Sequence, residues 1–390
     1  MSFSPQVVGP IDLPASIFVV TEVMSLLPED ILLEILSRLP GKALFRCKSV
    51  CKLWRALISN PSFVLSAAGR ERAINGFSPY GMKSMNFCSI DDDLTVVKLP
   101  NPTGKVPSDY DKFRFLGSCD GLILFYADES IYLWNPLTSC CRELTQLGAL
   151  AHRLQAPSLC RATLSGFCFD KASNDYKLVV VTPPFSRYCR LFDQCVFVAS
   201  LKKREVCMDI RFPYDFGFFN GDSGYMGALV SGHLHWLVHK QKQDHEQVII
   251  YFDQERNQFR EMPMPIDHEH GFRYVGLTNL YGCLSVSRAT RLFGHGDRGF
   301  SGYDDDFLIM REYGDNLSWT KLLTMNGCLV PLHTRISNKL VLITYDHSLY
   351  SYNFESKSCQ KMEILRNHEA RAGPLMFTES LASVDAILQA

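Results

Sequence analysis

The 390-residue chain lacks long apolar runs and an excess of charge of either sign. The run SIFVV at residues 17–21 is far too short to cross a bilayer, and neither a basic segment nor a cleavage site typical of a secretory signal accompanies it. Its 40 basic residues are balanced by 41 acidic ones, which argues against nucleic acid as a partner. We therefore expect an intracellular protein of the nucleus or cytoplasm that binds neither membrane nor nucleic acid.

The chain also lacks any C-x-x-C pair, although it contains 14 cysteines. Their spacing is irregular: Cys140 and Cys141 are adjacent, and Cys47 and Cys51 are four residues apart. A disulfide framework needs an oxidising compartment, which nothing else in the sequence indicates. We therefore expect most of these cysteines to be small, buried, apolar side chains with free thiols.

Catalytic motifs are missing as well. No G-x-S-x-G, G-x-x-x-x-G-K-[ST] or H-E-x-x-H occurs. GHGDRG at 294–299 fits G-x-G-x-x-G, but the residues after it read as a loop, whereas a dinucleotide site needs a helix there. The sequence therefore predicts no catalytic residue and no cofactor.

Two histidine pairs and two acidic triplets remain as candidates for metal binding: His233 with His235, His268 with His270, and the Asp runs at 91–93 and 304–306. A metal site needs a third or fourth ligand near each histidine pair, and none is convincing. The acidic triplets lack the alternating oxygen ligands and the glycine of a calcium loop. We expect histidines at the surface or in strand pairs, solvated acidic turns, and no metal.

What the sequence does contain is a dense helical segment near its start, residues 25–59. Pro28 suits the first position of a helix, with Glu29 and Asp30 in its positive N-terminal turn. Pro40-Gly41 ends that helix, whose apolar face consists of Ile31, Leu32, Ile35, Leu36 and Leu39.

Two further helices are expected after Pro40-Gly41. A short one covers residues 42–46, and the third carries Cys47, Val50, Cys51, Trp54, Leu57 and Ile58 before Asn60-Pro61. Three helices of this size cannot bury so much apolar surface among themselves, and exposing it is costly. Another protein could cover this face, or the helices could dock on the C-terminal part of their own chain.

From about residue 85 the pattern changes to short strands separated by turns. Six segments share one layout of strand, gap, strand, polar turn and strand: 86–100, 121–144, 195–210, 232–263, 282–322 and 338–364. Taken as equivalent, their turn positions Asp92, Asn135, Ser200, Asp253, Asp315 and Asn353 recur about every 52 residues. This period is typical of propeller blades. We therefore predict a mainly β chain: a three-helix domain followed by a β-propeller-like domain of about six blades.

Other all-β and α/β architectures are weaker alternatives. A parallel α/β sheet needs crossover helices between its strands, and the sequence shows no strong helix there. A pair of open β-sandwiches remains possible, and the variable intervals leave the blade count uncertain by one.

The helical segment resembles the F-box of plant F-box proteins. LPEDILLEILSRLPGKALFRCKSVCKLWRALISNPSF, residues 27–63, matches the family frame L-P…I-L-x-R-L-P…L…R-x-x-x-V-C-K-x-W…F. Gly41 replaces an apolar residue of that frame, and Phe45 replaces a leucine. The later chain resembles the associated C-terminal domain at 115–144, with G-S-C-D-G-L and L-W-N-P-L-T, and at 166–181 and 227–265.

This resemblance implies a non-catalytic substrate receptor of an SCF-type (SKP–cullin–F-box) ubiquitin ligase. Its F-box would bind the SKP-type adaptor, and through it the cullin and RING subunits. The C-terminal domain would hold a target protein for ubiquitination and proteasomal degradation. The alternatives are an F-box scaffold that binds the adaptor without directing degradation, and a propeller enzyme or sugar-binding module with an appended helical segment.

The resemblance also divides the chain into segments with expected roles. We expect a loose leader at 1–24, the F-box at 25–66, a linker at 67–84, the β-propeller-like domain at 85–380 and a tail at 381–390. Loops at 145–165, 182–194, 211–226 and 288–305 are candidates for target contact. The expected adaptor-binding residues, shared between core and interface, are Leu27, Pro28, Ile31, Leu32, Ile35, Leu36, Leu39, Pro40, Leu44, Val50, Trp54 and Leu57.

Overall fold

The structure is a computed structural model, and its chain divides into two compact units, residues 1–69 and residues 70–390. The residues that the structure describes are 27–39, 41–60, 63, 71–79, 86–90, 96–103, 113–154, 164–182, 195–203, 205–207, 210–215, 225–241, 246–266, 272–290, 304–326, 329–332, 339–344, 349–361 and 368–389.

The first unit contains three short helices: α2 (Glu29–Ser37), α3 (Gly41–Cys47) and α4 (Lys52–Ser59). Pro28 stands immediately before α2, where its carbonyl oxygen accepts hydrogen bonds from the amides of Ile31 and Leu32, both at 3.1 Å. Glu29 and Asp30 lie in the first turn, where carboxylates suit the positive end of the helix dipole. The three helices are therefore placed much as the apolar spacing predicts.

The third helix begins later than the sequence indicates. Cys47 ends α3 and Val50 lies in the turn that follows, so neither belongs to α4. Cys51 has an extended backbone at the N-cap of α4, and its Sγ accepts a hydrogen bond from the amide of Trp54 at 3.4 Å. Because cysteine is not among the usual N-cap residues, the spacing alone gave no sign of this boundary.

The described strands of the second unit form six separate sheets, here called blades A to F. Blade A contains β26 (His368–Thr378), β1 (Glu71–Pro79), β2 (Asn86–Ile90) and β3 (Val96–Leu99). Blade B contains β4 (Arg114–Cys119), β5 (Leu122–Ala127), β6 (Ser130–Asn135) and β7 (Cys140–Glu143). Blade C contains β8 (Leu164–Asp170), β9 (Asp175–Thr182), β10 (Cys195–Ser200), β11 (Val206–Cys207) and β13 (Tyr225–Met226).

The other three blades follow the same order along the chain. Blade D contains β12 (Tyr214–Asp215), β14 (Ala228–Val230), β15 (His233–Lys240), β16 (Gln247–Asp253) and β17 (Gln258–Met262). Blade E contains β18 (Phe272–Leu280), β19 (Cys283–Thr290), β20 (Asp304–Met310) and β21 (Trp319–Asn326). Blade F contains β22 (Leu329–Leu332), β23 (Lys339–Thr344), β24 (Leu349–Asn353) and β25 (Ser358–Lys361).

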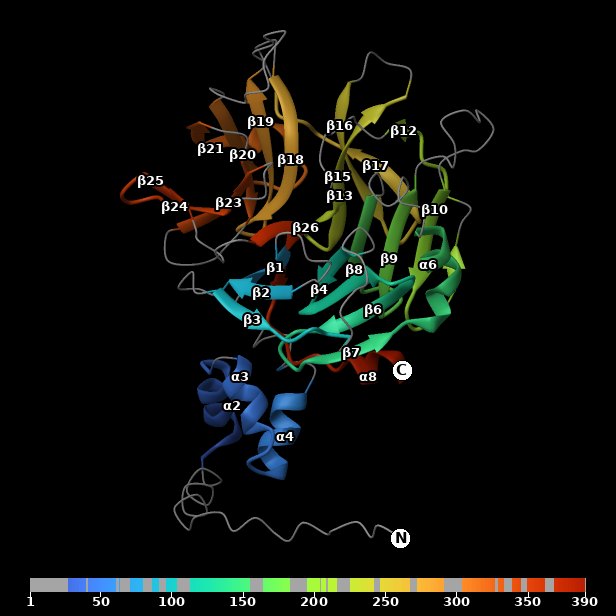
Figure 1. The fold of residues 1–390 in the computed structure, drawn as a ribbon, viewed down its shortest axis with the longest axis vertical. Helices are drawn as coiled ribbons and strands as arrows, with labels where there is room; N and C mark the ends of the chain where they lie inside the picture. Colours follow the sequence, from blue (N-terminus) through green and yellow to red (C-terminus); the bar gives the residue numbers. More distant parts are fainter. Residues whose placement is uncertain are drawn as a thin grey trace. The chain divides into compact units, whose positions relative to one another are not determined.

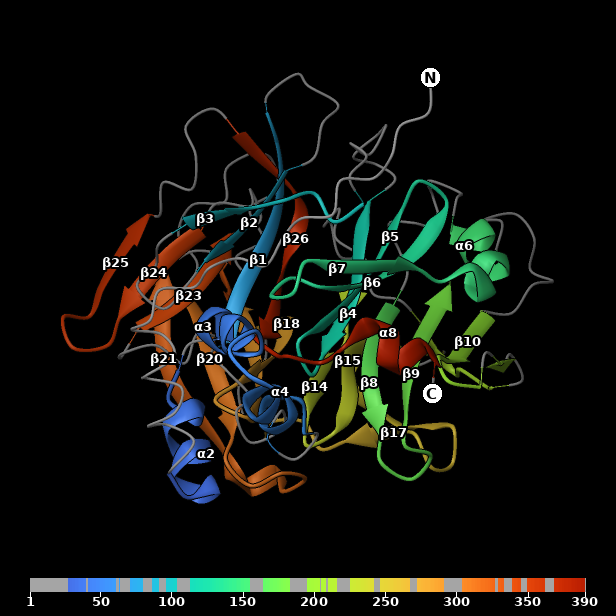
Figure 2. The ribbon, with the colours of Figure 1, turned by 90° about the horizontal axis from the view of Figure 1, so that it is seen from below.

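The six blades form a closed ring. One strand of each blade contacts a strand of the next in the order β26, β4, β8, β14, β18 and β22, and β22 contacts β26 again. Blade A is completed by the end of the chain, because β26 pairs antiparallel with β1 (Figures 1 and 2). The prediction of a mainly β chain with a small helical domain and a propeller-like domain is therefore confirmed.

The hydrophobic core of this unit lies between neighbouring blades. Alternate residues of β5 belong to different clusters: Leu122 and Leu124 pack toward blade C, while Ile123 and Phe125 pack toward blade A. Because successive side chains of a strand point to opposite faces of its sheet, a strand between two blades is apolar on both faces. This explains the continuous apolar run LILFYA, in which all six residues are buried.

The turns between the third and fourth strands of the blades explain the spacing found in the sequence. Asn135, Ser200, Asp253, Asp315 and Asn353 lie at this turn in blades B to F, and Asp92 lies outside the described residues. The Oδ1 atom of Asn135 accepts from the amide of Leu137 at 2.9 Å, and that of Asn353 accepts from the amide of Glu355 at 2.8 Å. The recurrent polar residue, an Asx in four of these blades and Ser200 in blade C, therefore closes its turn with its own side chain.

Two segment boundaries differ from those expected. Residues 71–79, assigned to a linker, form β1, whose partners β2 and β26 include a strand almost 300 residues later in the chain. The expected tail contains α8 (Val384–Gln389), where Val384 is fully buried. Its Asp385 forms an ion pair with Arg142 of β7, 2.7 Å from Oδ1 to Nε. The second unit thus uses both segments to close and cover its ring.

A helical stretch also replaces part of an expected loop. Residues 145–154 contain a 3₁₀ turn (Thr145–Leu147) and α6 (Gly148–Leu154). Leu147, Leu150 and Ala151 of this stretch are buried in the core between blades B and C. Their apolar spacing covers less than three helical turns, which is too short to stand out in the sequence.

Candidate functional site

The twelve residues expected to bind the adaptor divide by their exposure. Leu32, Leu36, Leu44 and Leu57 are buried, with at most 7% of each residue exposed. Leu27, Leu39 and Trp54 are half-buried, Pro28, Ile31, Ile35 and Val50 are exposed, and Pro40 lies outside the described residues. The four buried leucines are therefore not available for contact and support the surface from beneath.

The exposed apolar side chains of the helical unit are the candidate docking surface. Five large ones are between 37% and 45% exposed: Ile31, Ile35, Phe45, Val50 and Leu53. Exposed apolar groups concentrated in so small a unit are unusual for a surface that faces only water. We call this set the apolar surface. It explains why the segment carries more apolar residues than its own core uses.

Phe45 and Leu53 belong to the apolar surface but were not among the expected contact residues. Phe45 was noted only as a replacement for leucine in the family frame. Phe45 lies on α3, next to the buried Leu44, and Leu53 lies on α4, one turn before the buried Leu57. The signal that could have found them is the excess of apolar residues on these two helices over those that the core contains.

The charges of the helical unit are unevenly distributed. α2 has Glu29 and Asp30 in its first turn, and Glu34 pairs with Arg38 at 2.6 Å. Between Glu34 and Glu71 the sequence contains no acidic residue, and residues 41–60 contain five basic ones. Partial burial lowers the pKa of Lys48. The apolar surface therefore has basic neighbours on α3 and α4.

The short turns within the blades lie at one end of the strands, and two of the expected target-contact loops begin at the other end. Antiparallel strands place the turns at 120–121 and 136–139 at one end of blade B, and hydrogen bonds between blades tie this end together. Tyr176 Oη donates to Asp120 at 3.1 Å, and Lys177 Nζ donates to the carbonyl of Gln254 at 3.1 Å. The segments after Thr182 and Thr290 leave from the opposite end. Most of their residues lie outside the described ranges.

The aromatic run at 211–219 is partly structural. Phe212 and Tyr214 are buried between blades C and D, and the Phe212 ring lies 4.9 Å from that of Phe259, centroid to centroid. Residues 216–219 lie outside the described ranges. Phe212 and Tyr214 therefore pack beneath a blade edge.

The two histidines on β15 differ in burial, because His233 is half-buried and His235 is fully buried. His235 is fully buried, with Nδ1 3.2 Å from the carbonyl of Ala228 and Nε2 2.9 Å from Tyr313 Oη. Because a carbonyl only accepts, Nδ1 carries the proton and Nε2 accepts from the tyrosine. Burial lowers the pKa of His235 to about 4, so the ring is neutral at physiological pH. His268 and His270 lie outside the described residues.

The acidic triplet at 304–306 is not the solvated turn that the sequence indicates. It begins β20, and Asp306 is buried with Arg288 at 3.0 Å and Lys321 at 3.1 Å. Burial alone would raise the pKa of Asp306, but hydrogen bonds from Thr324, Lys321 and Arg288 lower it below its usual value. The residue is therefore an ionised structural anchor. The triplet at 91–93 lies outside the described residues.

The described cysteines are free thiols, and several of them are buried. Cys88, Cys119 and Cys168 are buried, and the adjacent Cys140 and Cys141 are not joined. Burial raises the pKa of both Cys141 and Cys168 to about 12. These thiols remain protonated at neutral pH and pack as small apolar groups.

Among the residues that the structure describes, no group of three or more His, Cys, Asp or Glu side chains is placed to hold a metal ion. Among the helices that the structure describes, none has the length and apolar character needed to cross a bilayer.

Comparison with known protein families matches both units. The F-box domain family matches residues 24–66, and the F-box associated beta propeller domain family matches residues 78–370. An F-box/kelch-repeat protein of Arabidopsis thaliana is 29% identical over 321 residues, which cover 77% of this chain and 80% of that protein. The F-box protein CPR1 of the same plant is 25% identical over 375 residues, covering 88% and 85%.

Solved structures resemble the chain only distantly. The periplasmic gluconolactonase of Pseudomonas aeruginosa aligns with a TM-score of 0.38 and 10% identity, covering 75% of this chain and 81% of that one. This likeness is too weak to indicate a function. The two family matches together span most of the chain and support the role of an SCF-type substrate adaptor. The chain belongs to the F-box proteins that carry an F-box associated beta propeller domain.

Proposed function

We propose that this protein is the substrate-recognition subunit of an SCF ubiquitin ligase. The helical unit binds an SKP-type adaptor, which links it to the cullin and RING subunits, and the propeller holds a target protein for ubiquitination and proteasomal degradation. The protein itself is non-catalytic and acts in the nucleus or cytoplasm. The observation that carries this proposal is the apolar surface of a unit whose sequence matches the F-box.

The energetics favour a protein partner for that surface. Covering a large aliphatic side chain stabilises a complex by about 1.5–3 kcal/mol when burial is complete. The core beneath is already formed by Leu32, Leu36 and Leu57, so the surface is held in place before binding. Such preorganisation lowers the entropic cost of association. Ile31, Ile35 and Val50 are therefore the contact residues of the proposal.

The propeller supports the second half of the proposal through geometry rather than chemistry. Holding a target beside a ubiquitin-loaded enzyme is a proximity effect, which needs a rigid platform and no reactive group of its own. The blades supply that platform, since their cores lie between them and their turns are tied by hydrogen bonds. We propose that the target binds at the end opposite these short turns.

Adaptor binding tests the first half. Isothermal titration of purified protein with an SKP-type adaptor should give a complex, and Ile31→Ala with Ile35→Ala should weaken it at least thirtyfold, equivalent to about 2 kcal/mol. Leu317→Ala is the matched control, because it removes an exposed aliphatic side chain from the propeller. Unchanged affinity of the double variant would contradict the proposal.

Target turnover tests the second half and separates it from the scaffold alternative. Apart from the adaptor and the cullin and RING subunits, which the Ile31→Ala/Ile35→Ala variant should lose, the proteins captured by the wild type and by the variant should be the same, because the propeller is intact in both. The abundance of at least one of them should rise when the proteasome or the cullin is inhibited. If no captured protein changes in abundance, the chain is a scaffold that binds the adaptor without directing degradation.

A further inference from the structure

The helices α3 and α4 and the turn between them carry four basic side chains whose charges are not balanced within the unit. These are Arg46, Lys48, Lys52 and Arg55, here called the basic face. Arg46, Lys52 and Arg55 are exposed, and Lys48 is half-buried. Within the described part of the chain, none of the four forms an ion pair with a carboxylate, whereas Arg38 of α2 does.

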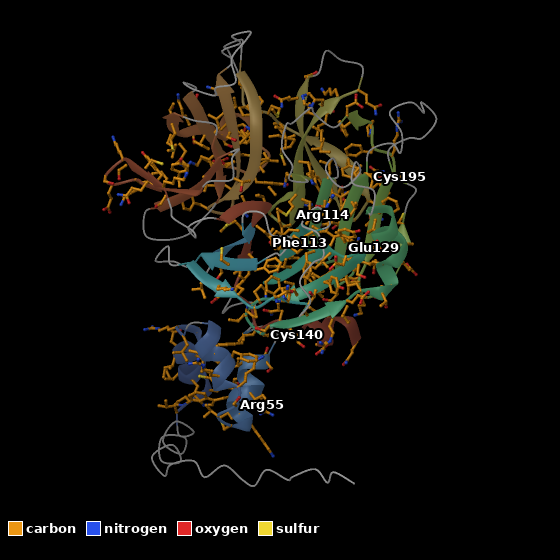
Figure 3. All side chains as sticks on the ribbon, in the orientation of Figure 1. Arg55, Phe113, Arg114, Glu129, Cys140 and Cys195 are labelled. Carbon is orange, nitrogen blue, oxygen red and sulfur yellow. The ribbon has the colours of Figure 1, made fainter. Side chains whose placement is uncertain are left out.

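Three of the four residues are neighbours in the fold. Arg55 Nε donates a hydrogen bond to the carbonyl oxygen of Lys48 at 3.1 Å, which links α4 to the turn after α3. Figure 3 labels Arg55 on the helical unit. Lys52 and Arg55 are three residues apart on α4, so they lie on the same side of the helix. Lys48, Lys52 and Arg55 therefore form a local positive region, and Arg46 lies two residues before Lys48 in the chain.

The position of these charges is unfavourable for the isolated unit. Lys52 and Arg55 occupy the first turn of α4, which contains no acidic residue, and the helix dipole is positive there. Arg46, in the last turn of α3, and Lys48, directly after it, are placed where the dipole favours a cation. Neither an ion pair nor the helix dipole accounts for the charges of Lys52 and Arg55, which is the arrangement expected when an outside anionic group supplies the compensation.

The basic face is interleaved with the apolar surface. Phe45 precedes Arg46, Val50 lies between Lys48 and Lys52, and Leu53 follows Lys52. An apolar centre with a charged rim is the usual composition of a protein interface, whereas a nucleic-acid or membrane site needs a wider positive field. The chain as a whole has a net charge of only −1, so the positive region is local to this unit.

We propose that the partner surface meeting α3 and α4 is acidic, and that the basic face steers its approach. This inference rests on the proposed function, since it takes the SKP-type adaptor as the partner. Charges at the rim of an interface change the association rate and its salt dependence far more than the dissociation rate. Steering of this kind raises association rates by about 10–1,000-fold and weakens with ionic strength.

Stopped-flow association of the full chain with a purified SKP-type adaptor tests the inference, at salt concentrations from about 0.02 to 1 M. Lys52→Glu with Arg55→Glu should lower the association rate constant at least tenfold at low salt. The difference should shrink at high salt, where the Debye length falls to about 3 Å. The dissociation rate constant should change much less than the association rate constant.

Lys202→Glu with Lys203→Glu is the matched control, because it makes the same change of charge at an exposed turn of blade C. Its association rate should stay within twofold of the wild type. An unchanged unfolding transition for both double variants separates a charge effect from loss of fold.

Two results would overturn the inference. One is a wild-type association rate that does not depend on salt and is not altered by the Lys52/Arg55 reversal; the adaptor still binds, so the proposed function survives. The other is binding to vesicles of equal phosphatidylserine and phosphatidylcholine that the reversal abolishes while the adaptor rate stays the same. Absence of any adaptor complex would instead contradict the proposed function itself.

Discussion

The two units treat apolar residues in opposite ways. In the propeller, β5 buries all six of its residues between two neighbouring blades, and Trp134 and Trp236 are almost fully enclosed. In the helical unit, Ile31, Phe45 and Val50 are more than two-fifths exposed. The helical unit therefore leaves large apolar side chains at its surface, whereas the propeller encloses its own and is closed by β26 and α8. The difference is the one expected between a unit that binds a partner and a unit that serves as a rigid platform.

The largest difference between the units is expected when apolar side chains are truncated. Trp236→Ala should lower the free energy of unfolding of the propeller by about 3–5 kcal/mol, because the indole fills the space between Gly166 and Gly227 and donates to the carbonyl of Ser165. Ile31→Ala should change stability by no more than about 0.5 kcal/mol, since the side chain is exposed. Urea titrations of both variants measure these losses of unfolding free energy. Equal losses would contradict the proposed difference between the two units.

The contact of the C-terminal segment with blade B can be broken at one glycine. Gly121 has φ +78°, and a Cβ there would lie 2.2 Å from the Cβ of Ser380. Gly121→Ala should cost about 2–4 kcal/mol, of which about 1–2 is the cost of a left-handed backbone. Gly232 has φ +82° with no atom within 4 Å of the added Cβ, so Gly232→Ala should show only the backbone cost. Thermal unfolding compares the two, and equal effects would mean that the close approach to Ser380 is not real.

Acidification should weaken the propeller through His235. Its pKa in the fold is lowered to about 4 by burial, whereas an unfolded histidine has a pKa of about 6.5. The unfolded chain therefore binds more protons between these values, and stability falls as the pH drops from about 6.5 to 4, by up to about 3 kcal/mol.

The matched variant for this pH effect is His235→Gln, which removes the titrating group. Its stability should depend less on pH over the same interval, as urea titrations from pH 7 to 4 would reveal. If the stability of the wild type and of the variant depended on pH in the same way, the pKa of His235 would not be lowered in the fold.

The smallest effect is expected at a polar turn. Asn135 is buried, and its Nδ2 donates to the carbonyls of Ser380 at 3.0 Å and Ala382 at 2.8 Å. Asn135→Ala should cost about 1–3 kcal/mol, because both carbonyls lose their donor. Asn353 closes the equivalent turn of blade F without such a role, so Asn353→Ala should cost about 0.5–1 kcal/mol. A larger loss of stability for Asn353→Ala than for Asn135→Ala in denaturant titrations would contradict the role of Asn135 in holding the C-terminal segment on blade B.

Local patterns determine which parts of this molecule the sequence could reveal. The apolar spacing of α2 and the recurrent Asx turn of the blades depend on neighbours within a few residues, and both are found where expected. β1 is hidden because its partner β26 joins it only when the ring closes, and Gly76 interrupts its register. α8 is hidden because its order depends on Asn135 and Arg142, about 250 residues earlier.

Local patterns also could not define the apolar surface of the helical unit. Periodicity identified the apolar residues of the helical unit but did not separate Leu32 and Leu36, which are buried, from Ile31 and Ile35, which are exposed. That division depends on how three short helices pack together. The burial of Asp306 could not be predicted for a related reason: Arg288 and Lys321, which neutralise its charge, lie on the neighbouring strands β19 and β21.

The affinity of the full chain for a purified SKP-type adaptor, with and without Ile31→Ala/Ile35→Ala, is the most direct test of the proposed role of the helical unit. We expect a stable complex for the wild type, at least thirtyfold weaker binding for the double variant, and an unchanged free energy of unfolding of the propeller. Equal adaptor affinity for the two proteins, with both folded, would contradict it.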